Sequence, residues 1–195
     1  KNVIEIGDYA FSGCKNLGKV TFEDGTAALT IGAEAFSSCS LLEDVSLPTR
    51  LTTIGSGAFR SCSSLTEITV PEGVMTIGVE AFQWCNKLIS VSLPSTLESI
   101  GYTQDNDGLQ MYLFRYCNLL EEINVADGND YFVSQNGILY GKTDGEITDL
   151  YPVPVNNSGI DGVVEVPSTL TKVWSGAFKE NVGLLKIDFG NVTGN

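Results

Sequence analysis

Residues 51–73 read LTTIGSGAFRSCSSLTEITVPEG and residues 74–96 read VMTIGVEAFQWCNKLISVSLPST, so one 23-residue pattern is written twice in succession. Phe59 and Phe82, the aromatic residues of the two copies, are 23 positions apart. A fixed period between about 20 and 50 residues is the sequence signature of a repeat protein. One such unit cannot bury its apolar face alone, so the repeats are predicted to stack into a solenoid.

The order of residue types within one unit predicts its local structure. Residues 65–70 place apolar side chains on one side of an extended segment, which predicts a short strand that ends at Pro71, a residue without an N–H to donate. Gly55 permits a tight bend where a Cβ would clash. Residues 58–62 carry Ala, Phe and Cys at spacings that suit a single helical turn, with Phe59 pointing inward.

The shared pattern is apolar-x-x-Ile-Gly-x-x-Ala-Phe-x-x-Cys-x-x-Leu-x-x-(Val/Ile)-x-(Leu/Val)-Pro. It resembles the BspA-type bacterial leucine-rich repeat, whose motif is roughly L-x-x-I-x-x-x-A-F-x-x-C-x-x-L-x-x-I-x-I-P. Four consecutive repeats meet this motif almost in full, and the match covers most of the chain. The resemblance implies a repeat solenoid, a right-handed coil made mainly of short β-strands with a helical turn in each repeat, interrupted by a β-meander.

The 195 residues are predicted to form a single leucine-rich-repeat solenoid over residues 1–195. The predicted order is repeats at about 1–23, 24–48, 49–71, 72–94 and 95–126, an interruption at 127–163 and a last repeat at 164–190. Within the interruption, Asn136-Gly137 between two apolar runs predicts a hairpin, and a third strand follows it to complete the meander. Trp174 replaces the expected Gly of the last repeat, and Asn181 replaces the expected Cys.

The charge of the chain argues against two classes of partner. A net charge of −13 and a pI near 4.2 disfavour binding to nucleic acid or to an anionic membrane, since both require basic patches. The sequence has no signal peptide and no apolar run long enough to span a bilayer. It starts inside a repeat without an obvious polar cap, so we expect a mature or excised fragment of a longer protein.

Five cysteines share one position of the repeat. They are Cys14, Cys39, Cys62, Cys85 and Cys117. Zinc sites use ligands paired at short spacing, such as C-x₂₋₄-C, and an odd number of thiols cannot pair completely within one chain. We therefore expect a buried ladder of small side chains, rather than a metal site, disulfides or a reactive thiol.

The sequence gives little support for an enzyme. It has no histidine, which removes Ser-His-Asp and Cys-His catalysis and His-based metal centres. Residues 137–143 are one residue short of a P-loop and lie in a predicted hairpin, and residues 105–108 fail the register of a calcium loop. A lysine or a carboxylate pair is the remaining catalytic alternative, although no feature selects one. The prediction is a protein without catalytic residues, cofactor or metal.

One candidate binding surface is the row of polar residues that alternate with inward-facing ones along the predicted strands. It comprises Lys19, Thr21, Asp44, Ser46, Glu67, Thr69, Ser90, Ser92, Glu122, Asn124, Lys186 and Asp188, of which the six from Asp44 to Ser92 are the predicted ligand-binding residues. Solenoids bind partners along such faces. A plain solvated strand face is the equally weighted alternative.

A second candidate surface is an insertion in the fifth repeat, where Phe82 and Phe114 are 32 positions apart. Its candidate binding residues are Tyr102, Gln104, Asn106, Gln110 and Tyr112. Aromatic and amide side chains of this kind are enriched in recognition loops. An insertion that is tolerated and binds nothing is the alternative, because solenoids accept insertions readily.

The resemblance also implies a function, since BspA-type proteins are linked with adhesion to host matrix proteins or to other cells. The leading hypothesis is a secreted or cell-surface module that binds a protein or glycan through the solenoid face and its loops, without nucleic acid as partner and without direct membrane insertion. The alternative is a structural spacer that holds another domain away from the cell surface.

Overall fold

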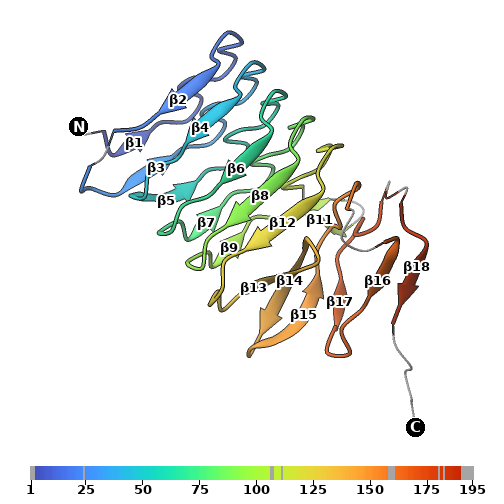
Figure 1. The fold of residues 1–195 in the computed structure, drawn as a ribbon. Coiled ribbons are helices and arrows are strands. Elements are labelled where there is room, and N and C mark those ends of the chain that lie inside the picture. The colour runs from blue at the N-terminus through green and yellow to red at the C-terminus, as the bar shows by residue number, and fades with distance from the viewer. Residues whose placement is uncertain are drawn as a thin grey trace.

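The protein is a stack of coils, as the repeat pattern predicts. The computed structural model describes residues 3–23, 25–105, 108–110, 112–157, 161–179, 181 and 183–189, and the backbone alone at 103–105 and 108–110. Figure 1 shows the coils following one another along an elongated body, from the N-terminal repeats in blue to the C-terminal repeat in red.

Parallel strands form one side of the stack. Its five-stranded sheet consists of β1 (Glu5–Ile6), β3 (Leu29–Ile31), β5 (Leu51–Ile54), β7 (Thr76–Ile77) and β9 (Ser99–Ile100). Ile31 pairs with Ile54, which in turn pairs with Ile77. The same repeat position therefore stacks on itself from coil to coil.

A second row of parallel strands forms the opposite side. It consists of β2 (Lys19–Thr21) paired with β4 (Asp44–Ser46), and of β6 (Glu67–Thr69), β8 (Ser90–Leu93) and β12 (Glu122–Val125) in a three-stranded sheet. Ile68, Val91 and Ile123 are aligned and buried. On each strand, the polar residues predicted to face outward lie on either side of this buried residue along the chain.

The Gly-x-x-Ala-Phe-x-x-Cys segment forms consecutive turns, and the helical turn expected there is absent, since the described residues contain no helix. Its N–H groups alternate between partners. Phe36 N donates to Ala58 O of the next coil at 2.8 Å, whereas Ser37 N donates to Glu34 O of its own coil at 3.0 Å. Glu34 and Ser38 have positive φ values of 51° and 60°. An α-helix needs every N–H bonded four residues back along the same segment, so coil-to-coil bonding excludes one here.

Stacked aromatic rings run through the centre of the coils. Phe11, Phe36, Phe59, Phe82 and Phe114 follow one another with ring centroids 5.1 to 5.9 Å apart and planes within 11° of parallel. The three middle rings are buried. Each ring covers its neighbour, which keeps water out of the core along the length of the ladder.

The thiols form a second column beside these rings. The Sγ atoms of Cys39, Cys62, Cys85 and Cys117 donate to phenylalanine carbonyls of the preceding coils at 3.1 to 3.2 Å. These four side chains are buried and all five cysteines are free, which confirms the ladder. The prediction is wrong for Cys14, which is exposed because no described coil covers it.

The interruption forms the predicted β-meander of β13 (Phe132–Gln135), β14 (Ile138–Thr143) and β15 (Glu146–Leu150). Asn136 and Gly137 turn the chain with φ values of 51° and 75°, the left-handed conformations that a two-residue hairpin requires. Phe132 and Leu139 pack into the solenoid core, so the meander continues it. The last repeat then adds β17 (Lys172–Val173) to β15 and pairs β16 (Val163–Glu165) with β18 (Lys186–Asp188).

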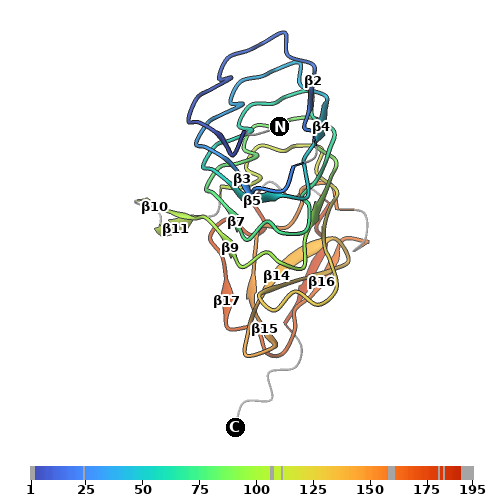
Figure 2. The ribbon, with the colours of Figure 1, turned by 90° about the vertical axis from the view of Figure 1, so that its left-hand side faces the viewer.

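The insertion in the fifth repeat carries a small antiparallel hairpin of β10 (Thr103–Asp105) and β11 (Gly108–Gln110). Figure 2 shows this hairpin projecting sideways from the stack of coils. The insertion is therefore accommodated outside the core, as expected of a solenoid.

Asn129 joins the last regular coil to the meander, although no motif singles it out. Its side chain is buried; Nδ2 donates to Pro94 O and Leu97 O, and Oδ1 accepts from the N–H groups of Tyr131 and Phe132. All four bonds are 2.7 to 3.0 Å long. One amide thus satisfies four backbone groups where the repeat pattern ends.

Asn129→Ala is expected to lower the free energy of unfolding by about 3 kcal/mol, because it leaves buried backbone donors and acceptors without partners. Urea denaturation followed by far-ultraviolet circular dichroism measures the change. Asn118→Ala, at an exposed asparagine, is the control and should cost less than about 0.5 kcal/mol. Equal losses in the two variants would show that the buried amide is not a structural tie.

Candidate ligand-binding site

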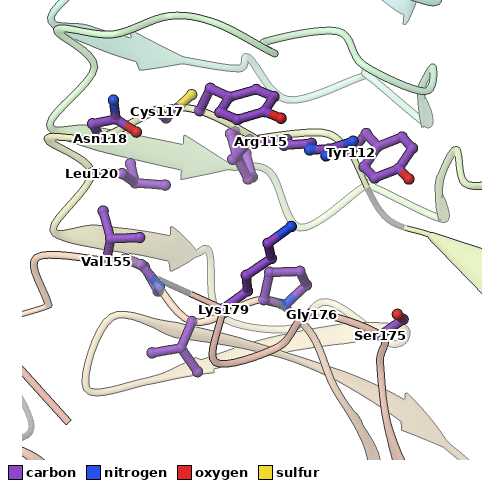
Figure 3. Close-up of a pocket in the computed structure, with 14 residues that line it drawn as sticks. Tyr112, Arg115, Cys117, Asn118, Leu120, Val155, Ser175, Gly176 and Lys179 are labelled. Atoms are coloured by element: carbon purple, nitrogen blue, oxygen red, sulfur yellow. The ribbon is translucent and has the colours of Figure 1, made fainter. Parts of the chain in front are cut away.

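A cavity of about 310 Å³ lies where the fifth repeat meets the interruption and the last repeat (Figure 3). Residues 112–120 line one side of it, and residues 152–155 and 175–179 line the other. The cavity exists because the phenylalanine stack stops at Phe114. A Pro-Val-Pro segment, rather than another repeat, follows it in the stack.

That segment is fixed by hydrogen bonds on both sides. Val153 N donates to Ala177 O at 2.7 Å, toward the last repeat, and Asn181 Nδ2 donates to Pro154 O at 3.0 Å. Toward the fifth repeat, Asn156 N donates to Leu120 O at 3.1 Å. The Pro-Val-Pro segment is therefore held between two coils. It leaves the cavity beside the turn of the fifth repeat unfilled.

The floor of the cavity is apolar and its rim is cationic and aromatic. Phe114, Leu120, Val153 and Pro154 form the floor, and the lining residues that the structure describes include no Asp or Glu. Cys117 also contributes to the lining, but burial raises the pKa of its thiol to about 12, which keeps it protonated and a poor nucleophile at neutral pH. The arrangement suits binding rather than covalent chemistry.

Arg115 is the principal cation of the rim. Its guanidinium carbon lies 4.5 Å from the ring centroid of Tyr112 and 4.7 Å from that of Tyr116, within the range of cation–π contacts. Lys179 extends from the last repeat into the cavity (Figure 3). Among the described residues, neither cation lies within ion-pair distance of a carboxylate, whereas Arg60 pairs with carboxylates on both neighbouring coils.

The aromatic rim continues onto the outer surface. Trp84 stacks on Tyr116 with ring centroids 3.9 Å apart and an interplanar angle of 21°. Trp84 remains 43% exposed. Both residues have positive φ, 64° and 65°, at the position before the cysteine, where earlier coils have Gly13, Ser38 and Ser61. Bulky residues occupy this left-handed conformation only at an energetic cost.

The predicted strand row is only partly continuous. Asp44, Ser46, Glu67 and Thr69 are exposed, and Ser90 and Ser92 are half-buried. Their registers align the outward positions across β6, β8 and β12. Lys186 and Asp188, however, lie on β18, which pairs with β16 rather than with this sheet. The interruption therefore separates the last repeat from the row.

The five residues predicted in the insertion do not form one site. Tyr112 lines the cavity, while Tyr102 is 55% exposed and contacts Trp174 at a centroid distance of 5.6 Å. Gln104 and Gln110 lie on β10 and β11 of the projecting hairpin, and Asn106 lies outside the described residues. Whether any of them binds a ligand stays a prediction.

Sequence reasoning missed the residues that form the cavity rim and the aromatic stack beside it. These are Trp84, Arg115, Tyr116 and Lys179. Comparing one position across repeats would have revealed the change from Gly or Ser to Trp and Tyr. Nothing local marks the two cations, which come from segments separated by the whole interruption.

Two further features are absent from the described ranges. No group of three or more His, Cys, Asp or Glu there is arranged to hold a metal ion. Within the same ranges, no helix has the length and apolar character needed to cross a membrane.

Comparison with known proteins gives one family and several similar folds. The family model described as BspA type leucine rich repeat region (6 copies) matches residues 1–106 and 29–135. No curated protein sequence matches the chain. The family match covers the regular coils and ends within the meander.

Three solved structures share the fold. The pneumococcal vaccine antigen PcpA has a TM-score of 0.77 and 23% identity, over 94% of this chain and 48% of its own. A leucine-rich repeat protein from Eubacterium ventriosum has a TM-score of 0.70 and 22% identity, over 96% and 45%. A leucine rich cell surface protein from Faecalibacterium prausnitzii has a TM-score of 0.59 and 22% identity, over 96% and 59%. The chain thus spans about half the length of these structures.

Proposed function

The chain belongs to the BspA type leucine-rich repeat family, and we propose that it is a recognition module that binds a protein partner outside the cell or at a bacterial cell surface. Leucine-rich repeats are protein-interaction scaffolds, and no enzymatic family is indicated. Support for the location comes from two proteins of similar fold, a vaccine antigen and a cell surface protein. Adhesion to a host matrix protein, another cell or a glycan follows as the biological role.

The observation that carries this proposal is the stack of the exposed Trp84 on the half-buried Tyr116. These side chains add little to the core, and both adopt a left-handed backbone that Gly would adopt at lower cost. Tryptophan and tyrosine are the residue types most enriched at the energetic centres of protein interfaces. A partner that contacts the exposed Trp84 and the ring of Tyr116 explains why bulky aromatic residues occupy these strained positions.

The module would act by extended contact, with no bond made or broken. The strand row from Asp44 to Asn124 supplies short polar groups for peripheral hydrogen bonds. The aromatic stack and the adjacent cavity supply the apolar centre. An interface of apolar centre and polar rim is the usual anatomy of protein recognition.

The double variant Trp84→Ser and Tyr116→Ser is expected to weaken partner capture at least tenfold, since removal of a central aromatic residue commonly costs 2 kcal/mol or more, by order of magnitude. Surface plasmon resonance against an immobilised panel of matrix proteins and glycans provides the partner and the measurement. Serine already occupies this position in two other coils, so the fold should be retained.

Tyr9→Ser is the matched control for this experiment. Tyr9 is also exposed, at 60%, and also has a positive φ, of 59°, but it lies in the first coil. Loss of capture in the double variant but not in the control supports the proposal. Equal capture by both variants and the parent would exclude the aromatic stack as the contact surface.

A rigid spacer is the second candidate function, and one observation favours it. A single apolar cluster extends from Leu29 through the meander to Trp174, which makes the coils one continuous body. Absence of saturable binding to every member of the panel would favour this reading over recognition.

A further inference from the structure

We propose that the cavity beside Tyr112 binds an acidic side chain of a protein partner, with the carboxylate on Arg115 and Lys179 and a neighbouring aliphatic side chain on the apolar floor. This rests on the proposed function, recognition of a protein, and adds the chemistry of the ligand. The carboxylate is assigned to an Asp or Glu within a segment, because solenoids contact partners along their length rather than at a chain end.

Arg115 is prepared for a carboxylate before any ligand arrives. Tyr112 and Tyr116 lie against its guanidinium group at 4.5 and 4.7 Å. Rings that stack on the guanidinium leave its N–H edge for hydrogen bonds, and the planar fork of that edge matches the two oxygens of a carboxylate. Because the side chain is already ordered by stacking, binding costs little further conformational entropy.

Charge favours an anion at this place and disfavours one elsewhere on the protein. The chain carries a net charge of −13, yet the described residues that line the cavity include two cations and no acidic residue. Four other cations of the described chain, Lys19, Arg60, Lys172 and Lys186, form ion pairs with carboxylates of the chain itself. Arg115 and Lys179 have no such carboxylate partner among the described residues, so a ligand can supply it.

The floor favours a peptide over an acidic sugar. A sugar ring would place hydroxyl groups against Phe114, Leu120 and Val153, which offer no hydrogen-bonding side-chain atoms, and buried hydroxyls without partners are costly. An aliphatic side chain meets the same surface favourably. A volume of about 310 Å³ is at the lower end for ligand pockets and suits one or two side chains.

The test uses the peptide acetyl-Ser-Gly-Leu-Glu-Gly-Ser-amide, whose blocked ends leave a single carboxylate, and its Gln analogue. Binding to the ¹⁵N-labelled chain is followed by nuclear magnetic resonance titration. Saturable shifts at residues lining the cavity are expected for the Glu peptide. The Gln peptide should bind about tenfold more weakly or worse, as loss of a charged hydrogen bond predicts.

Arg115→Gln and Lys179→Gln should each weaken the Glu peptide about tenfold, while Lys15→Gln, the same charge change at an exposed lysine of the first coil, should leave it within about twofold. Lys179 is exposed, so its variant tests the charge without a risk to the fold. Equal binding of the Glu and Gln peptides would overturn the proposal. So would a glucuronate oligosaccharide that saturates the cavity when the Glu peptide does not.

Failure here and failure of the proposed function give different results. If capture from the panel depends on Trp84 and Tyr116 but the Glu peptide does not bind, only the ligand assignment is wrong. If the Glu peptide binds through Arg115 but no panel member is captured, the cavity chemistry holds and the adhesion role fails.

Discussion

Gly55→Ala is expected to lower the free energy of unfolding by about 4 kcal/mol, whereas Gly7→Ala should change it by less than about 0.5 kcal/mol. Both glycines follow the isoleucine of the repeat motif. A Cβ added at Gly55 would lie 2.5 Å from Gly32 C and 2.7 Å from Ala33 N, whereas one added at Gly7 meets nothing within 4 Å. One repeat position thus supplies both the test and its control.

The cost at Gly55 is high because the obstructing atoms are backbone. A crowded side chain can rotate away, but Gly32 and Ala33 belong to a coil hydrogen-bonded to the next one, where Gly55 N donates to Ile31 O at 2.7 Å. To admit a methyl group, the coils must separate and lose that hydrogen bond together with part of the core contact. Overpacking that only displaces side chains costs less.

Urea denaturation of the two variants and the parent measures these changes, with the transition midpoint and its slope reported separately. A repeat protein can unfold in more than one step, so a changed slope would indicate that the coils have become uncoupled. Similar losses in Gly55→Ala and Gly7→Ala would mean that backbone flexibility, rather than the spacing between coils, explains the glycine.

The inward-facing and outward-facing positions of each coil could be predicted from the sequence because the same motif recurs several times. Each copy of the motif constrains the others, and residues 51–96 already fix which side chains face inward. The helical turn was mispredicted for a local reason. Over a segment as short as residues 58–62, spacings of three to four fit both a helical turn and consecutive β-turns. What decides between them is the bonding of alternate N–H groups to the next coil, which a single repeat does not show.

The cavity could not be predicted for the opposite reason, since it lies where the repetition ends. Its two walls come from residues 112–120 and from segments after the interruption, and no motif relates them. The sequence drew attention to Tyr112, but as part of an insertion loop rather than as a neighbour of Arg115. A repeat sequence is therefore least informative where its periodic pattern is interrupted. Such interruptions are also where a search for a functional site should begin.

Stability is expected to fall steeply above about pH 9, by about 4 kcal/mol for each pH unit, because of the thiol ladder. Burial raises the pKa of the Cys117 thiol to about 12 and raises those of Cys62 and Cys85 as well, with smaller contributions from neighbouring thiols at the last two. In the unfolded chain a thiol loses its proton near pH 8.5, by order of magnitude. Between these values these three thiols leave the unfolded state with three fewer protons than the native state, so rising pH favours unfolding. Burial also raises the pKa of the Cys39 thiol, which acts in the same direction.

The window between about pH 9 and pH 10 isolates this effect. Well below about pH 8.5, both states keep the three thiols protonated and the contribution to stability is complete. Above the window, tyrosines of the unfolded chain begin to titrate near pH 10. They act in the same direction, since burial, and to a lesser extent Asp149, raises the pKa of Tyr151 to about 12. Urea denaturation at several pH values within the window gives the slope directly.

Cys85→Ala should reduce that slope by about a third, or about 1.4 kcal/mol for each pH unit, since one of the three protons is removed from the balance. Leu88→Ala is the control, because it truncates a buried side chain of the same coil and removes no thiol. It should lower stability by about 2 to 5 kcal/mol at every pH and leave the slope unchanged. If the two variants kept the same slope, the thiols would not be its source. A reduced slope in Cys85→Ala alone would show that the stability of the fold depends on the protonated thiols of the ladder.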